Sequence, residues 1–188
     1  MASEPVSEPK VLIERYCRNG DKEAFSQFYR RQSRLLWRYL RARGVDGETA
    51  YDLLSEAFVR FIQAACKDTS APVALLYRIA INLHIDHYRR SRRTAVHLDA
   101  VQKDAGEHLF GASCEDQAHL SRLLKTLPAD EQNMLLLRYW LGMTHKEVAR
   151  VLHVPEGTIR RQCAATLKKL SLKWGLEERL DEPAELEV

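Results

Sequence analysis

The sequence has few residues that break helices and no long apolar run. Only 8 glycines and 6 prolines occur among its 188 residues, about 7% where roughly 12% is usual. This composition favours helices and disfavours a collagenous chain, a turn-rich β-sandwich or a long disordered chain. The longest apolar stretch, residues 71–83, contains Arg78, so we expect no membrane insertion. The N-terminus carries acids where a signal peptide carries bases, and we therefore expect a cytoplasmic protein.

The four cysteines are widely spaced along the chain, with no two within 45 residues: Cys17, Cys66, Cys114 and Cys163. The sequence has no CxxC pair and no zinc-site spacing, so we expect neither a disulfide framework nor a metal centre. We interpret the cysteines as buried or idle thiols in a reducing compartment. His84 and His87 can share a helix face, but no Cys or carboxylate completes a metal site at a convincing spacing. No metal or other cofactor is expected.

Charge is distributed in blocks along the chain. Residues 10–93 carry a net charge of +8 and residues 119–176 one of +6. Residues 94–118 between them carry −4, and residues 177–188 carry −5. Two basic blocks separated by an acidic stretch suggest a polyanion contacted at two places, and two ordinary helical domains with solvated surfaces are the alternative.

Apolar residues recur with helical periodicity through both basic blocks. Helices are expected at about 10–19, 21–44, 47–66, 73–93, 119–126, 129–141, 145–152 and 155–174, the second with Asp21 as N-cap. The clearest amphipathic pattern lies in the third of these: Ala50, Leu53, Leu54, Ala57, Phe58, Phe61, Ile62 and Ala65. The expected fold class is all-α, with two small helical domains, 10–93 and 119–176. A flexible acidic linker, 94–118, joins them and an acidic tail, 177–188, follows.

The segment from Thr144 to Leu170 has the pattern of a short helix, a tight turn and a longer helix. Thr144 and Glu147 have the spacing of a capping box, and Pro155 suits the first turn of the longer helix. The longer helix has an apolar stripe at every third or fourth position: Ile159, Cys163, Leu167, Leu170 and Trp174. This pattern predicts a helix-turn-helix.

The opposite face of the longer helix carries hydrogen-bond donors and positive charge. Guanidinium groups can bind guanine, an amide can bind adenine, and cations bind phosphate. We therefore predict that this face contacts DNA, and a plain helical hairpin with a solvated basic face is the alternative. The predicted contact residues are Thr158, Arg160, Arg161, Gln162, Ala165 and Lys168.

Two parts of the sequence together resemble a known family. The segment LPADEQNMLLLRYWLGMTHKEVARVLHVPEGTIRRQ (127–162) resembles the C-terminal DNA-binding region of bacterial sigma factors. The segments DLLSEAFVR (52–60) and LYRIAINLHIDHYRR (76–90) resemble the N-terminal conserved region of that family. In this order, with a 25-residue linker and no intervening domain, they resemble the extracytoplasmic-function (ECF) type over about residues 11–174.

The resemblance implies a promoter-specificity factor that binds core RNA polymerase and directs transcription initiation, and that is not an enzyme. It implies that the first domain docks on the polymerase clamp, then opens and reads the −10 element as melted DNA. It also implies that the second domain reads the −35 element as double-stranded DNA. Many family members are held inactive by an anti-sigma factor, so such a partner is expected.

The resemblance also assigns roles to side chains of the first domain. Thr49, Asp52 and Glu56 are placed on the exposed face of helix 47–66 and would bind core polymerase, a solvated face being the alternative. In helix 73–93, aromatic and basic side chains suit stacking on unpaired bases and holding the backbone. The residues assigned to −10 DNA are Tyr77, Arg78, Asn82, Tyr88, Arg89 and Arg92, with core packing as the alternative for the tyrosines.

The sequence departs from the family pattern at several positions. Thr49 and Tyr51 stand where the family commonly has acids, which predicts weaker binding to core polymerase. We hypothesise that a Ser/Thr kinase phosphorylates Thr49 and restores about two negative charges. His153 replaces the usual turn glycine, and because histidine tolerates the left-handed region, the turn should still form. The weakened acidic face also favours an alternative function, a sigma-like DNA-binding regulator that does not itself drive initiation.

Overall fold

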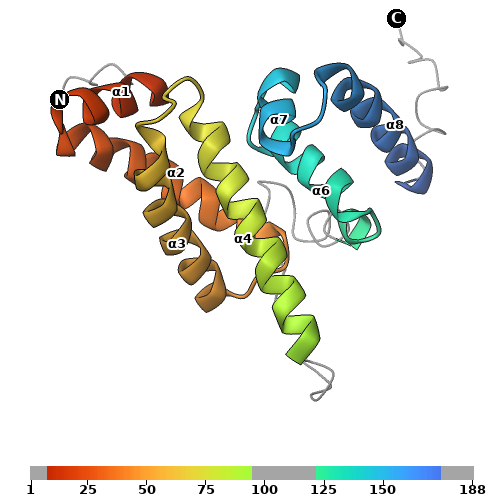
Figure 1. Ribbon diagram of the computed structural model, residues 1–188. Coiled ribbons are helices and arrows are strands. Elements are labelled where there is room, and N and C mark those ends of the chain that lie inside the picture. Colours follow the sequence, from red (N-terminus) through yellow and green to blue (C-terminus); the bar gives the residue numbers. More distant parts are fainter. Residues whose placement is uncertain (1–7, 95–121, 175–188) are drawn as a thin grey trace, which may run out of the picture. The chain divides into compact units, whose positions relative to one another are not determined.

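The computed structural model describes residues 8–94 and 122–174, and their regular secondary structure is helical with no strand (Figure 1). The chain divides into two compact units, Met1–Gly111 and Ala112–Val188. The predicted linker, 94–118, lies outside the described residues except for Thr94, and the predicted tail, 177–188, lies outside them entirely. None of the helices in the described ranges combines the length and the apolar character that a membrane span needs.

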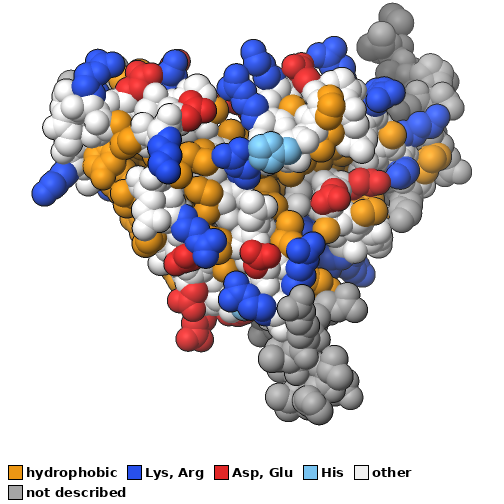
Figure 2. All heavy atoms as spheres, viewed as in Figure 1, with side chains coloured by type: hydrophobic (Ala, Val, Ile, Leu, Met, Phe, Trp, Pro, Cys, Tyr) orange, Lys and Arg blue, Asp and Glu red, His pale blue; other side chains and the backbone are white. Residues whose placement is uncertain are grey.

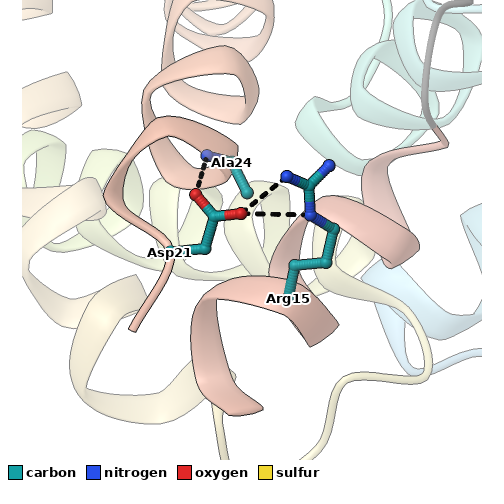
Figure 3. A network of polar contacts seen from close by, with 3 residues as sticks. All are labelled: Arg15, Asp21 and Ala24. Carbon is teal, nitrogen blue, oxygen red and sulfur yellow. Dashed lines mark hydrogen bonds and ion pairs between the residues drawn. The ribbon is translucent and has the colours of Figure 1, made fainter. Parts of the chain in front are cut away.

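The first unit contains four described helices: α1 (Pro9–Asn19), α2 (Lys22–Ala42), α3 (Gly47–Ala65) and α4 (Pro72–Thr94). Gly20 ends α1 with a φ of 66°, a conformation that favours glycine. Asp21 caps α2 as predicted, since its carboxylate accepts a 3.0 Å hydrogen bond from the Ala24 N–H. Arg15 of α1 donates to the same carboxylate over 2.6 Å (Figure 3). These two bonds lower the pKa of Asp21 and connect α1 to the start of α2.

The core of the first unit is rich in aromatic side chains. Phe28 of α2 stacks on Phe61 of α3 with ring centroids 5.1 Å apart, and Phe58 lies edge-on to both rings. Such aromatic contacts add to the stabilisation from burial of the rings. The predicted apolar stripe of α3 faces this core except for Ile62, which is 39% exposed.

The expectation of four idle thiols is wrong for one pair of cysteines. Cys17, in the last turn of α1, and Cys66, which directly follows α3, form a disulfide, with Cα atoms 5.3 Å apart. The 49 residues between them gave no sign of this proximity, because only the packing of α1 beside the end of α3 creates it. Cys163 is a free, buried thiol, whose pKa is raised by burial.

The second unit contains a helical stretch at 122–125, then α6 (Ala129–Leu135), a π-helical segment η2 (Leu136–Trp140), α7 (His145–Leu152) and α8 (Glu156–Trp174). The single α-helix predicted over 129–141 therefore changes to a wider turn at Leu136. There, the Leu141 N–H donates to the Leu136 carbonyl, five residues back, over 3.0 Å. Five consecutive residues, 133–137, are buried, more than one face of a regular α-helix can place inward in a row.

The helix-turn-helix forms as predicted. The Thr144 hydroxyl accepts from the Glu147 N–H, and the Glu147 carboxylate accepts from the Thr144 N–H, which completes the capping box. His153 ends α7 in the left-handed conformation with a φ of 55°. α8 begins soon after, at Glu156, so the turn is short. His153 adopts the left-handed conformation that glycine usually takes, and the turn still forms.

Candidate nucleic-acid interface

The exposed face of α8 carries most of the residues predicted to contact DNA. Arg160, Arg161, Gln162, Ala165 and Lys168 are exposed, and Thr158 is half-buried near the start of the helix. Figure 2 shows Lys and Arg side chains along the part of the surface that α8 forms. The exposed donors therefore form a continuous polar face over about three helical turns.

Among the stripe residues whose side chains the structure describes, which exclude Trp174, the buried face of α8 differs from the prediction at one position. Leu167 is 41% exposed, and Thr166 takes its place in the core with 1% exposure. The Thr166 hydroxyl donates to the Glu131 carboxylate of α6 over 3.0 Å, and the Lys169 ammonium lies 3.1 Å from the same carboxylate. A buried hydroxyl needs such a partner, so this contact fixes the rotation of α8 about its axis.

Arg160 is the one predicted DNA contact on α8 for which the structure gives an ion pair. Its guanidinium lies 3.1 Å from the Glu156 carboxylate, one turn earlier, and the two side chains are 70% and 43% exposed. Exposed pairs of this kind contribute little to stability. The guanidinium can therefore exchange Glu156 for a phosphate or a base edge at small cost.

On α4, the structure separates the residues predicted to contact melted DNA. Asn82, Tyr88 and Arg89 are exposed, and Arg78 is half-buried. Of Arg92 only the helical backbone is described. The exposed residues and Arg78 can form one surface along α4 for a single strand.

Tyr77 does not belong to this surface, which corrects the prediction. Its side chain is 1% exposed, and its ring lies edge-on to Tyr39 of α2 at 5.5 Å. Burial raises the pKa of both tyrosine hydroxyls well above their usual range. The alternative, core packing, therefore holds for Tyr77, whereas Tyr88 is 53% exposed.

His84 lies on α4 between these positions and is half-buried. Burial lowers the pKa of its imidazole to about 4, and the positive charge of Arg43, followed by His87, lowers it further. The side chain is therefore neutral at pH 7. It supports the packing of α4 and adds no charge to the proposed DNA-binding surface.

The exposed face of α3 carries two of the three residues predicted to bind core polymerase. Asp52 and Glu56 are exposed, and Glu56 forms a 2.6 Å ion pair with Arg60. Figure 2 shows acidic side chains gathered at the end of the first unit where α3 begins. Negative charge on an exposed helix face can complement a basic partner.

Thr49 is half-buried, whereas the prediction placed it on the exposed face of α3. Its N–H donates to the Asp46 carboxylate over 2.9 Å, and its hydroxyl also bonds to that group. Both bonds lower the pKa of Asp46, the N-cap of α3, and the bond from the Thr49 hydroxyl has the larger effect. Thr49 therefore takes part in the capped first turn of α3.

Sequence reasoning missed an aromatic contact beside the start of α3. Tyr51 is 60% exposed and its ring lies 5.6 Å from Trp37 of α2. The guanidinium of Arg41 lies 5.8 Å from the centre of the same indole. The helical periodicities of α2 and α3 indicated which residues are apolar, but not that these faces meet. At the position where the resemblance implies an acid, this chain therefore has a tyrosine packed against a tryptophan.

Two family models match the chain, one on each unit. The model for sigma-70 region 2 matches residues 28–94, and the model for sigma-70 region 4 matches residues 118–170. The first match contains α3 and α4, and the second contains the helix-turn-helix. The order of the two matches agrees with the order of the two candidate surfaces.

Curated proteins from several bacteria are similar to the chain over most of its length. The RNA polymerase sigma-H factor of Pseudomonas aeruginosa is 30% identical over 168 residues, which cover 79% of this chain and 84% of that protein. The ECF RNA polymerase sigma factor SigM of Mycobacterium tuberculosis is 29% identical over 155 residues, which cover 81% and 78%. The chain therefore belongs to the ECF family of RNA polymerase sigma factors.

A solved structure supports the same fold. The structure of CnrH in complex with the cytosolic domain of CnrY matches 89% of this chain and 97% of that chain, with a TM-score of 0.67 and 22% identity. The sigma factor RpoE of Bartonella quintana, solved with the anti-sigma factor NepR, matches with a TM-score of 0.59 and 19% identity. At these identities the comparison speaks for the all-helical fold alone.

Proposed function

We propose that the protein binds core RNA polymerase in the cytoplasm and directs it to a dedicated set of promoters. The observation that carries this proposal is the pairing of an acidic face on α3 with an exposed donor face on α8, in the order of the family's two conserved regions. The acidic face would bind the polymerase, and α4 and α8 would read the −10 and −35 elements. The two domains, 10–93 and 119–176, would each bind one promoter element, and an acidic linker, 94–118, would join them.

Promoter reading by α8 is tested with Arg161→Ala in transcription from a promoter that depends on the protein. Arg161 is exposed on the proposed DNA-binding face, and losing one base or phosphate contact costs about 1–3 kcal/mol. We expect about a tenfold loss of transcript. Lys22→Ala, which removes an exposed charge at the start of α2, is the matched control. Equal losses in the two variants would argue against a role for the α8 face.

Reading of melted DNA by α4 is tested in the same assay with Tyr88→Ala. Its ring is 53% exposed, which supports a stacking role, and one base–aromatic stack is worth about 1–3 kcal/mol. We expect Tyr88→Ala to reduce the transcript level. If Tyr88 assists melting, this reduction should be smaller on a template whose −10 region is opened in advance by mismatches. Tyr139→Ala, an equally exposed tyrosine of the second unit, is the control. An unchanged transcript level for Tyr88→Ala would remove this residue from the proposal.

Binding of core polymerase by α3 is tested with the double variant Asp52→Asn and Glu56→Gln. Both carboxylates are exposed and the replacements keep side-chain size, so the fold should persist. We expect weaker association with purified core enzyme, with an effect that falls at high salt. Glu14→Gln, which removes one negative charge from α1, is the control for a change of charge away from α3. Undiminished association of the double variant would contradict the assignment.

Regulation by phosphorylation of Thr49 is a further part of the proposal. A phosphate in the first turn of α3 would be favoured by the helix dipole, but it would lie beside the Asp46 carboxylate that the Thr49 hydroxyl now binds. We expect Thr49→Asp to bind core polymerase more tightly than Thr49→Ala, and Thr69→Asp to have no effect. The same affinity for both Thr49 variants would leave inhibition by an anti-sigma factor as the proposed control.

One observation favours the alternative of a DNA-binding regulator that does not drive initiation. Of the two exposed carboxylates that are predicted to bind core polymerase, Asp52 and Glu56, the second is already paired with Arg60. Specific DNA binding without association with core polymerase would support this alternative. Association with core polymerase followed by specific transcription would exclude it.

A further inference from the structure

The disulfide joins α1, which lies before the residues that match the region 2 model, to the end of α3, which lies within them. Cys17 lies in α1, before the region 2 match begins at residue 28, whereas Cys66 lies within that match. Figure 1 shows the end of α1 beside the loop that follows α3. The region 2 match therefore contains only one of the two cysteines.

Both sulfur atoms belong to residues that a small thiol can approach. Cys66 is exposed and Cys17 is half-buried, and each lies at a helix end. The exposed cations Arg18 and Lys67 are their neighbours in sequence, and positive charge near a cysteine favours the reactive thiolate. By contrast, Cys163 is buried in the second unit. Among the described cysteines, thiol exchange is therefore directed to this one pair.

α1 keeps other attachments when the disulfide is open. Leu12 and Ile13 are buried, and the ring of Tyr16 packs on Phe25 of α2 at 5.0 Å. The ion pair from Arg15 to Asp21 closes the same side of the helix (Figure 3). None of these contacts involves α3, so opening the bond releases α1 from the end of α3 while its contacts with α2 remain. Both redox forms can therefore be folded.

We propose that Cys17 and Cys66 form a redox-responsive site that sets how firmly α1 is held in the first unit. A low-molecular-weight disulfide such as oxidised glutathione accepts the two electrons. One protein thiolate attacks it and releases one glutathione thiol, and the second protein thiolate then displaces the other glutathione to form the Cys17–Cys66 bond. The sum is one protein dithiol and one small disulfide converted to one protein disulfide and two small thiols. Excess reduced glutathione reverses both steps.

The test uses the full-length protein equilibrated at graded ratios of reduced to oxidised glutathione. After an acid quench, free thiols are alkylated and mapped by mass spectrometry, and amide hydrogen exchange of α1 is measured in parallel. We expect Cys17 and Cys66 to lose alkylation together as the oxidised fraction rises and to regain it when thiol is restored. We expect exchange in α1 to slow by at least about tenfold in the oxidised form.

Variants separate the pair from the other cysteines. In Cys17→Ser and Cys66→Ser, hydrogen exchange of α1 should match that of the reduced protein at every ratio, because the remaining thiol can form only a mixed disulfide with glutathione. Cys114→Ser should respond as the unchanged protein does. Three results would overturn the proposal: two free thiols at every ratio, a bond that native reduction never opens, or equal exchange of α1 in both forms. All three can be measured on the unchanged protein, so they decide the matter even if a variant fails to fold.

Discussion

The two units hold their functional helices by different means. In the first, aromatic rings from α2, α3 and α4 pack together, including Phe28, Phe61 and the edge-on pair of Tyr39 and Tyr77. In the second, the core is mainly aliphatic, and a polar contact between Thr166 and Glu131 orients α8. The comparison shows two solutions to one problem: an exposed charged helix face needs a buried face that fixes its rotation.

The largest effect is expected from removing an aromatic ring of the first core. Phe61 is fully buried, so Phe61→Ala should lower the free energy of unfolding of that unit by about 4 kcal/mol. Ile62→Ala changes the next residue, which is 39% exposed, and should cost far less. Hydrogen exchange resolved by unit measures both. Equal loss of protection in α8 would show that the units do not unfold independently, and would break the comparison.

A smaller effect is expected from acid, acting through His84. Its folded-state pKa of about 4 lies below the ordinary value of 6.5, so the unfolded chain binds the proton more readily. This contribution to stability is present above pH 6.5 and is lost as the pH falls toward 4. From pH 7 to pH 5 the first unit should lose about 2 kcal/mol. Urea unfolding at both pH values measures this, and an equal loss in His84→Gln would rule out His84 as the cause.

The smallest effect is expected from the polar contact of the second unit. Thr166→Val keeps the shape of the buried side chain but removes the hydroxyl that donates to Glu131, and should cost about 1 kcal/mol. Ser171→Ala, on the same helix, removes a hydroxyl that donates to the Lys168 carbonyl at the exposed surface. Its unfolding free energy should stay close to that of the unchanged protein. An equal loss of unfolding free energy in the two variants would mean that the contact between Thr166 and Glu131 does not contribute specifically to the stability of the second unit.

Helical periodicity was sufficient for most of the fold and for the face of α8. The capping box at Thr144 and the exposure of Arg161 both follow from local spacing, which a sequence displays directly. Tyr77 was misplaced because an aromatic residue beside bases fits a core and a DNA surface equally well, and only its contact with Tyr39 decides between them. The prediction buries Leu167, whereas the structure buries Thr166. The sequence does not indicate this because Glu131, the partner of Thr166, lies 35 residues away in the chain.

The features that could not be predicted depend on tertiary packing. The Cys17–Cys66 bond requires two helix ends to meet, and the contact of Tyr51 with Trp37 requires two helix faces to meet. The π-helical turn at Leu136 depends on burying several consecutive side chains at once. In each case the sequence gives the residue types, but it does not indicate which residues lie in contact.

The most direct test of the account is run-off transcription with purified core RNA polymerase and the unmodified protein. The templates are fragments of the host genome, including the region upstream of this gene. The account predicts specific transcripts that need the added protein and that weaken with Arg161→Ala. No transcript from any fragment, with the same core enzyme active on another sigma factor's promoter, would contradict intrinsic promoter-specificity activity. That result would favour control through Thr49 or the non-initiating alternative.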